Sequence, residues 1–107
     1  MVLGHLWKLE GYTLLNKGNF WKSDDDWRFN TQDGKLCIEN VSTAKVFGIE
    51  TNTDNVFHEI FDESNTNQTW LKGEENDEGF FTLTNPSSKK VLTATSSDTQ
   101  KVYGEYS

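Results

Sequence analysis

Residues 37–53 read CIENVSTAKVFGIETNT and residues 82–98 read TLTNPSSKKVLTATSSD, and the two stretches align at a constant offset of 45 positions. Each carries an asparagine, a short polar run and then a lysine followed by apolar residues. The matched pairs are Ile38 with Leu83, Asn40 with Asn85, Lys45 with Lys90, Val46 with Val91 and Phe47 with Leu92. Such repetition predicts a fold built from equivalent units.

A tryptophan leads into each copy: Trp27 precedes the first and Trp70 the second, 43 positions apart. One unit of a few short strands cannot bury its own apolar face, whereas two or three units around a pseudo-symmetry axis share a core. We therefore expect both indoles to be interior. Asn40 and Asn85 suit turns, because an asparagine side chain bonds the backbone two residues on and tolerates positive φ.

The front of the chain leaves the number of units open. Residues 6–23 read LWKLEGYTLLNKGNFWKS and place Trp7, Asn16 and the pair Phe20-Trp21 in the order of the other copies. The spacing is shorter, since Asn16 lies only 24 positions before Asn40. The sequence is compatible with two units or with three.

Short runs rich in Val, Ile, Thr, Phe and Trp, separated by Asn, Asp, Gly and Ser clusters, predict an all-β chain. No stretch repeats apolar residues at helical spacing, so we predict no helix. At 107 residues we expect a single domain, 1–107. The predicted strands are 5–9, 12–15, 19–23, 27–31, 35–39, 45–50, 56–61, 68–73, 80–84, 89–95 and 101–106.

The charge balance disfavours polyanionic partners. The chain has 17 acidic and 10 basic residues, a formal charge of −7 and no basic run. Nucleic-acid affinity depends on clustered Lys and Arg that displace counterions, and anionic membranes attract the same clusters. No stretch approaches the length of a membrane span. We expect no nucleic-acid partner and no membrane insertion.

Cys37 is the only cysteine, so no internal disulfide can form. The apolar run near residue 1 is short and is interrupted early by polar residues, unlike a secretory signal. We expect a cytoplasmic protein, or one secreted without a signal peptide in the sequence given.

Residues 67–70 read NQTW and residues 79–94 read GFFTLTNPSSKKVLTA. With its Gln68-Thr69-Trp70 signature, the chain resembles the ricin-type β-trefoil lectin family, whose units carry a Gln-x-Trp motif. The resemblance implies a β-trefoil-like barrel, complete or incomplete, built from two or three pseudo-symmetric units. Residues 19–29, NFWKSDDDWRF, are also similar to the amaranthin-like agglutinins, another trefoil group.

The chain departs from the family pattern in three respects. No final Gln-x-Trp follows the predicted strand 101–106, so we expect the trefoil to lack one or two strands. Asp25 and Asp26 stand before Trp27 in place of Gln-x. Sugar-binding units of the family place an aspartate in their second strand, and the matching residues here are Lys22, Gly48 and Thr93.

A sugar site needs a planar carboxylate or amide for vicinal hydroxyls and an aromatic face for the C–H surface. In the best-preserved unit, Asn67 and Gln68 supply amides, and the strand 56–61 supplies His58 with Asp62 just beyond it. The resemblance implies that these residues border one pocket. The alternative is that Asn67 and Gln68 only bond the backbone of a tight loop.

A second candidate patch lies near the front of the chain, where Trp21 is close in sequence to three consecutive aspartates. Its candidate ligand-binding residues are Trp21, Asp24 and Asp26, with Asp25 and Asn19 beside them. Sugar hydroxyls or a peptide would suit this patch, and a solvated turn is the alternative. We predict no metal site, because calcium loops need alternating oxygen ligands and a closing Glu.

The sequence offers little for catalysis. Cys37 and His58 would form the only thiol–imidazole pair, and strand alternation makes Cys37 a packing residue. The many carboxylates lie on polar stretches, where nothing separates the pKa of one from that of another. No zinc spacing, phosphate-binding glycine loop or dinucleotide motif is present. We predict no catalytic residues, no enzyme activity and no cofactor.

These features predict a carbohydrate-binding, lectin-like module whose partner is a carbohydrate or glycoprotein. The alternative is a protein-binding trefoil, such as a protease inhibitor, that acts through an exposed loop at 62–69 or 73–79. Strands missing from a trefoil would leave exposed edges for another copy to cover. We therefore expect a homodimer or a higher homo-oligomer.

Overall fold

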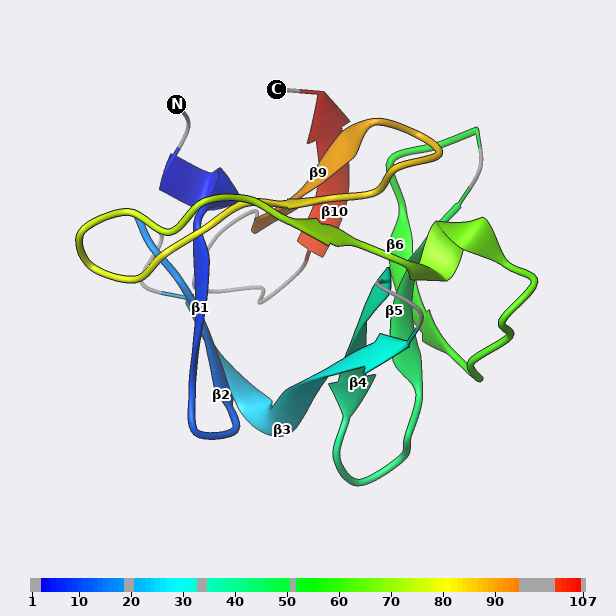
Figure 1. Ribbon diagram of the computed structural model, residues 1–107, viewed down its shortest axis with the longest axis horizontal. Helices are drawn as coiled ribbons and strands as arrows, with labels where there is room; N and C mark the ends of the chain where they lie inside the picture. The colour runs from blue at the N-terminus through cyan, green and yellow to red at the C-terminus, as the bar shows by residue number, and fades with distance from the viewer. Residues whose placement is uncertain (1–2, 19–20, 33–34, 51, 95–101, 107) are drawn as a thin grey trace.

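The computed structural model describes residues 3–18, 21–32, 35–50, 52–94 and 102–106 (Figure 1). This part of the chain is all-β, with two short 3₁₀ turns, η1 (Leu3–His5) and η2 (Thr66–Gln68). None of its helices is long and apolar enough to cross a membrane. The strands are β1 (Trp7–Glu10), β2 (Thr13–Asn16), β3 (Trp21–Gln32), β4 (Lys35–Asn40), β5 (Val46–Ile49), β6 (Val56–Glu59), β7 (Leu71–Lys72), β8 (Leu83–Thr84), β9 (Lys90–Ala94) and β10 (Val102–Tyr106).

The all-β prediction is confirmed, with one difference in strand number. The described part of the run predicted at 19–23 and the run predicted at 27–31 lie in one long strand, β3, because Asp26 between them continues the pairing with β2. Residues 19–20 lie outside the described residues. This pairing has a register shift between Thr13 and Leu15, which marks a bulge. A bulge inserts an unpaired residue and lets a long strand bend, so β3 can serve two neighbours.

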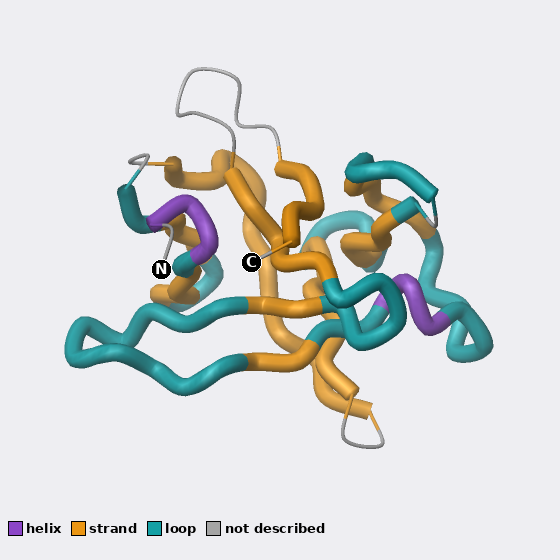
Figure 2. Tube along the Cα trace, turned by 90° about the horizontal axis from the view of Figure 1, so that it is seen from above, coloured by secondary structure: helices purple, strands orange, loops and turns teal. Residues whose placement is uncertain are grey.

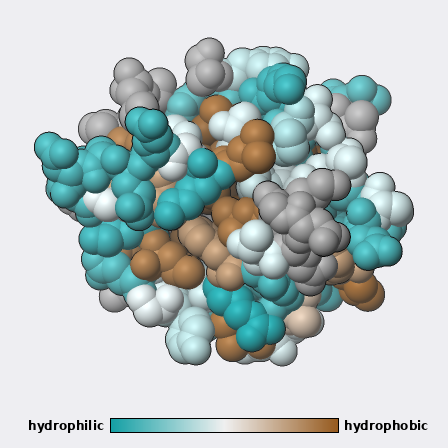
Figure 3. Space-filling view, in the orientation of Figure 1, coloured by the Kyte–Doolittle hydropathy of each residue, from teal (hydrophilic) through white to brown (hydrophobic). Residues whose placement is uncertain are grey.

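The strands form two antiparallel sheets, one ordered β1-β2-β3-β4-β5-β6 and one ordered β10-β9-β8-β7. Isolated bridges join the sheets at three places: Trp7 to Phe81, Leu36 to Trp70 and Asn55 to Tyr103. The two sheets are therefore joined by isolated bridges, and continuous strand pairing does not close the barrel. Figure 3 shows apolar side chains reaching the surface near the middle of one face, with hydrophilic groups around them.

The two copies of the repeat form the same turn. The backbone nitrogen of Asn40 donates to the backbone carbonyl of Lys45 at 2.8 Å. The backbone nitrogen of Asn85 likewise donates to the backbone carbonyl of Lys90 at 2.9 Å. The backbone carbonyl of each asparagine accepts from the backbone nitrogen four positions on, that of Ala44 or Lys89, at 2.9 Å. Ala44 (φ 62°) and Lys89 (φ 66°) adopt the left-handed conformation that closes the turn. The predicted equivalence is confirmed for residues 38–47 and 83–92.

Three tryptophans make equivalent contacts, so the structure has three units. The amide nitrogens of Trp27, Trp70 and Trp7 donate to the carbonyls of Tyr12, Leu36 and Phe81, each at 2.8 Å. Four residues after each acceptor stands an asparagine: Asn16, Asn40 or Asn85. The front unit is the compressed one, since the path from Asn16 to Trp27 is much shorter than that from Asn40 to Trp70.

Trp7 belongs to a different unit from the one suggested by its place in the sequence. The sequence order grouped it with Asn16, whereas its backbone and side chain both bond the unit that begins at Phe81. η1 accordingly contacts β9, although the two are far apart in the chain (Figure 1). His5-Leu6-Trp7 thus occupies in the third unit the position that Gln68-Thr69-Trp70 occupies in the second.

The core is assembled from all three units. Trp7, Trp27 and Trp70 are at most 2% exposed, as predicted for the last two. The Trp27 and Phe47 rings stack with centroids 4.4 Å apart and planes inclined by 12°. The remaining buried members of this cluster are Leu14, Ile38, Ile49, Phe81, Leu83, Leu92 and Ala94.

Candidate ligand-binding site

The segment between β6 and η2 is shaped by the signature glutamine. Gln68 is 1% exposed, and its amide nitrogen donates to the carbonyl of Ile60 at 2.9 Å. Its amide oxygen accepts from the backbone nitrogen of Asp62 at 2.7 Å. Both ends of the amide are thus bonded to the backbone. Gln68 therefore holds the loop in shape, and its predicted contact with a ligand stays a prediction.

Asp62 presents its carboxylate to solvent. Its Oδ1 accepts from the hydroxyl of Ser64 at 2.7 Å and from the backbone nitrogen of Ser64 at 3.0 Å. These hydrogen bonds lower the pKa of Asp62 below its ordinary value. The side chain is exposed, so an ionised carboxylate is available at the surface of the loop.

Asn67 is half-buried within the same loop. Its backbone nitrogen donates to the side-chain oxygen of Asn65 at 3.0 Å, which caps η2. The turn is also bonded to the next unit, because the buried amide of Asn85 donates to the carbonyls of Thr66 at 3.2 Å and Thr69 at 3.0 Å. These hydrogen bonds therefore hold the loop in one conformation against the next unit.

His58 is exposed on β6, and its described ring contacts are with core aromatic residues rather than with Asp62 or Asn67. Its ring packs edge-on against Trp27 and Phe47, with centroid separations of 4.9 and 4.7 Å. Desolvation lowers the pKa of His58. The negative charge of Asp25 partly opposes this shift, and the positive charge of Lys45 adds to it. His58 is therefore a neutral ring at neutral pH that covers the Trp27–Phe47 stack.

The front patch is only partly described. The backbones of Trp21 and Asp24 lie in β3, but their side chains fall outside the described part of the structure, so their proposed ligand contacts stay predictions. Asp26 is exposed, and its carbonyl accepts from the backbone nitrogen of Val41 at 2.9 Å. The charge of its neighbour Asp25 reaches His58.

Glu59 is a surface carboxylate that the sequence analysis missed. It lies on the outer face of β6 with Phe57, since alternate residues of a strand share a face. Gly48 pairs directly with Phe57, and a side chain at residue 48 would collide with Oε1 of Glu59. The carboxylate of Glu59 therefore rests over the glycine that replaces the family's aspartate.

The third unit has a counterpart of this glutamate. Glu59 pairs with Val46 and Glu105 pairs with Val91, the residue that matches Val46 in the repeat. In the same register Tyr103 corresponds to Phe57, because they pair with the matched residues Thr93 and Gly48. The sequence signal existed, but insertions before β10 shift the alignment by one position and hide it.

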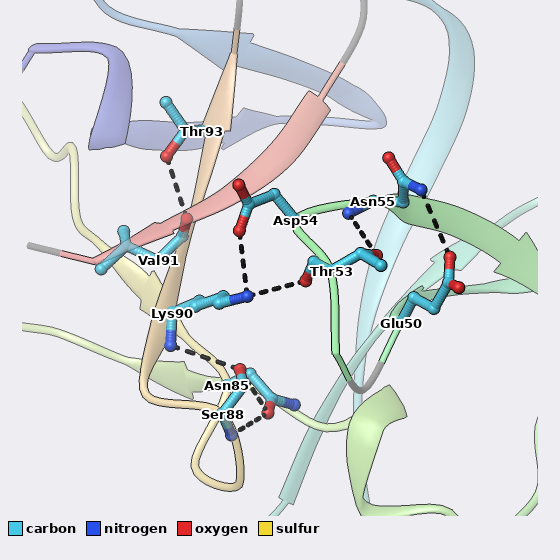
Figure 4. A network of polar contacts seen from close by, with 9 residues as sticks. All are labelled: Glu50, Thr53, Asp54, Asn55, Asn85, Ser88, Lys90, Val91 and Thr93. Atoms are coloured by element: carbon cyan, nitrogen blue, oxygen red, sulfur yellow. Dashed lines mark hydrogen bonds and ion pairs between the residues drawn. The ribbon is translucent and has the colours of Figure 1, made fainter.

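The matched lysines differ in role. Lys90 is 7% exposed, and its Nζ donates to the carbonyl of Thr53 at 2.7 Å and pairs with Oδ1 of Asp54 at 2.9 Å (Figure 4). The backbone nitrogen of Gly104 donates to the carbonyl of Asp54 at 2.7 Å. Lys90 thus fastens the loop between β5 and β6 to the third unit, whereas Lys45 is exposed.

Repeated asparagine turns, closing tryptophans and a shared core define a pseudo-symmetric trefoil-type β protein. The family model described as ricin-type beta-trefoil lectin domain-like matches residues 23–102. The chain belongs to this family, whose lectin-like character points to carbohydrate binding. Neither the curated proteins nor the solved structures gave a match.

Proposed function

We propose that this protein binds carbohydrate without transforming it. The family match over residues 23–102 carries this proposal, because it spans the complete second unit with its Gln-x-Trp motif. The fixed loop between β6 and η2 supports it, since a preorganised set of polar groups binds hydroxyls at a lower entropic cost. Ionised Asp62 and the amides of Asn65 and Asn67 lie on this loop.

Screening on a glycan array tests the proposal. The expected result is reproducible binding of a restricted set of glycans by the folded protein. Mass spectrometry of a bound oligosaccharide after prolonged incubation should show an unchanged mass, as a non-catalytic module requires. A folded protein that retains no glycan contradicts the proposal, and a cleaved oligosaccharide contradicts its non-catalytic part.

Binding through one shallow site is expected to be weak, so we propose that association of copies adds avidity. Large apolar side chains at the surface, including Ile60 at 78% and Leu71 at 53% exposure, support association of two chains. Sedimentation velocity should show a dimer or a larger species. A strict monomer at high concentration contradicts this part.

A protein-binding function is the second candidate, and it rests on the loop between β7 and β8. This loop extends well away from the strands it connects (Figure 2). Asn76 organises its tip by accepting at Oδ1 from the backbone nitrogens of Glu78 at 2.9 Å and Phe80 at 3.0 Å. Lys17 forms an ion pair with Glu78 at this tip. The exposed acidic residues of this loop are Glu74, Glu75, Asp77 and Glu78.

The two functions separate by mutation. A protease inhibitor acting through this loop should lose inhibition when Glu74, Glu75 and Asp77 are changed to their amides, and should keep it when Asp62 is changed to Asn. A lectin of the proposed design should respond in the opposite way. Assays against serine and cysteine proteases, run beside the glycan array, measure both responses.

A further inference from the structure

The two equivalent glutamates, Glu59 and Glu105, have different surroundings. Oε1 of Glu105 lies 3.0 Å from Nε2 of His5, and its Oε2 accepts from the hydroxyl of Tyr103 at 2.8 Å. Both oxygens of Glu105 are thus engaged at normal hydrogen-bond distances. These bonds lower the pKa of Glu105, so the group is held as a carboxylate.

In the second unit, Glu59 has no counterparts of the two donors that bond Glu105. Gln68 replaces His5, and its amide is used by the backbone of Ile60 and Asp62. Phe57 replaces Tyr103 and has no hydroxyl. Among the described residues, one hydrogen-bond donor reaches the Glu59 carboxylate: Nδ2 of Asn65 at 3.5 Å, the far limit of a hydrogen bond.

The Glu59 side chain is nevertheless packed against neighbouring residues. It is half-buried, and Gly48 leaves room for its carboxylate against β5. Phe57 is 39% exposed on the same face and offers an apolar ring beside the carboxylate. An ionised carboxyl has about four acceptor sites, and most of those on Glu59 are unused by described residues.

We propose that Glu59 binds a sugar hydroxyl in the position that the hydroxyl of Tyr103 holds against Glu105. The ligand class is a saccharide with vicinal hydroxyls: one hydroxyl donates to Glu59, a neighbour contacts the Asn65 amide, and a C–H face packs on Phe57. This inference rests on the proposed carbohydrate-binding function and assigns its site to the outer face of the β5–β6 hairpin.

Nuclear magnetic resonance titration locates the site. The probes are the methyl glycosides of galactose, glucose and mannose, and N-acetylglucosamine, each added at millimolar concentration to isotope-labelled protein. The expected result is a saturable shift of the Gly48, Phe57 and Asn65 amide signals by at least one sugar. Shifts confined to other segments overturn the inference and leave the proposed function standing. No shift with any of the sugars contradicts both.

Three variants test the chemistry with the sugar that binds. Glu59→Gln should weaken binding by roughly tenfold or more, because a charge-assisted hydrogen bond is lost. Glu63→Gln, the same change on an exposed loop residue, should leave the affinity unaltered. Equal affinities of wild type and Glu59→Gln overturn the inference.

Phe57→Tyr gives the sharpest test, because it restores the third unit's arrangement. Its hydroxyl would donate to Glu59 as Tyr103 does to Glu105, and would compete with the ligand. Binding should weaken severalfold with stability retained, as measured by denaturant unfolding. An affinity unchanged by this substitution overturns the proposed equivalence between the ligand hydroxyl and that of Tyr103.

Discussion

The indole nitrogen of Trp7 donates a hydrogen bond to the carbonyl of Leu92 at 2.8 Å, across most of the length of the chain. The indole of Trp70 makes the matching bond to Phe47 at 3.3 Å within its own unit. Since Phe47 and Leu92 are partners in the repeat, the two tryptophans serve equivalent units. The third unit is therefore completed by the segment that begins the described structure.

Replacing Trp7 with Phe should destabilise the protein as a core change does, although the residue lies near the N-terminus. The Leu92 carbonyl would lose a buried donor, at a cost of about 1–3 kcal/mol. Trp70→Phe should cost a similar or smaller amount, because its bond is longer. Urea unfolding measures both, with Tyr12→Phe at an exposed site as control. A Trp7 variant as stable as wild type would show that the third unit closes without it.

The turn asparagines should differ in their contribution to stability. Asn40 and Asn85 both accept backbone hydrogen bonds at Oδ1, from Thr43 and Ser88 respectively. Asn85 also donates to two carbonyls of the neighbouring unit and is fully buried. We expect Asn40→Ala to cost about 1 kcal/mol and Asn85→Ala about 3 kcal/mol.

Thermal and denaturant unfolding of both variants measure this difference. Asn52→Ala, at an exposed position, is the matched control and should change stability little. Equal losses for the two turn variants would mean that the bonds from Asn85 to Thr66 and Thr69 add nothing.

The repeat in the sequence was sufficient to predict the strand class, the buried Trp27 and Trp70, and the equivalence of the two turns. These depend on local patterns that survive in each copy. The partner of Trp7 could not be predicted, because the segment that it closes is distant in sequence and carries His5 in place of the signature glutamine.

The candidate site was predicted less well than the fold. Gln68 was recognisable from its motif, but its burial and backbone bonds depend on the path of the loop from Ile60 to Asp62. His58 was grouped with that loop, yet strand alternation turns it to the opposite side of β6 from Glu59. Glu59 could be recognised as a candidate only from the structure, because the room that Gly48 leaves for its carboxylate is not visible in the sequence.

The thiol of Cys37 should be unreactive in the folded protein. Cys37 is 3% exposed, and burial, followed by the charge of Glu39, raises its pKa. The thiolate is the reactive form, so both accessibility and ionisation oppose modification. Ellman's reagent should titrate one thiol in denaturant and react far more slowly with native protein. Fast modification without denaturant would contradict the buried placement on β4.

Acidification should weaken the contact of His58 with the Trp27–Phe47 stack. Desolvation lowers the pKa of His58 in the folded protein, so its stabilising contribution is present above the ordinary value near 6.5 and is lost as the pH falls through the lowered value. The charge of Asp25 limits this loss, and that of Lys45 increases it. Between pH 7 and pH 5 the melting temperature should fall, and less so in His58→Gln.

Tryptophan fluorescence measures the local part of this effect, because Trp27 is in contact with the titrating ring. In the wild type the emission should change over the same pH interval as the loss of stability. His5 is the other histidine of the chain, so His5→Gln is the matched control and should retain this fluorescence change. If the change persists in His58→Gln and disappears in His5→Gln, the titrating group is at the contact between His5 and Glu105, and the role assigned to His58 is wrong.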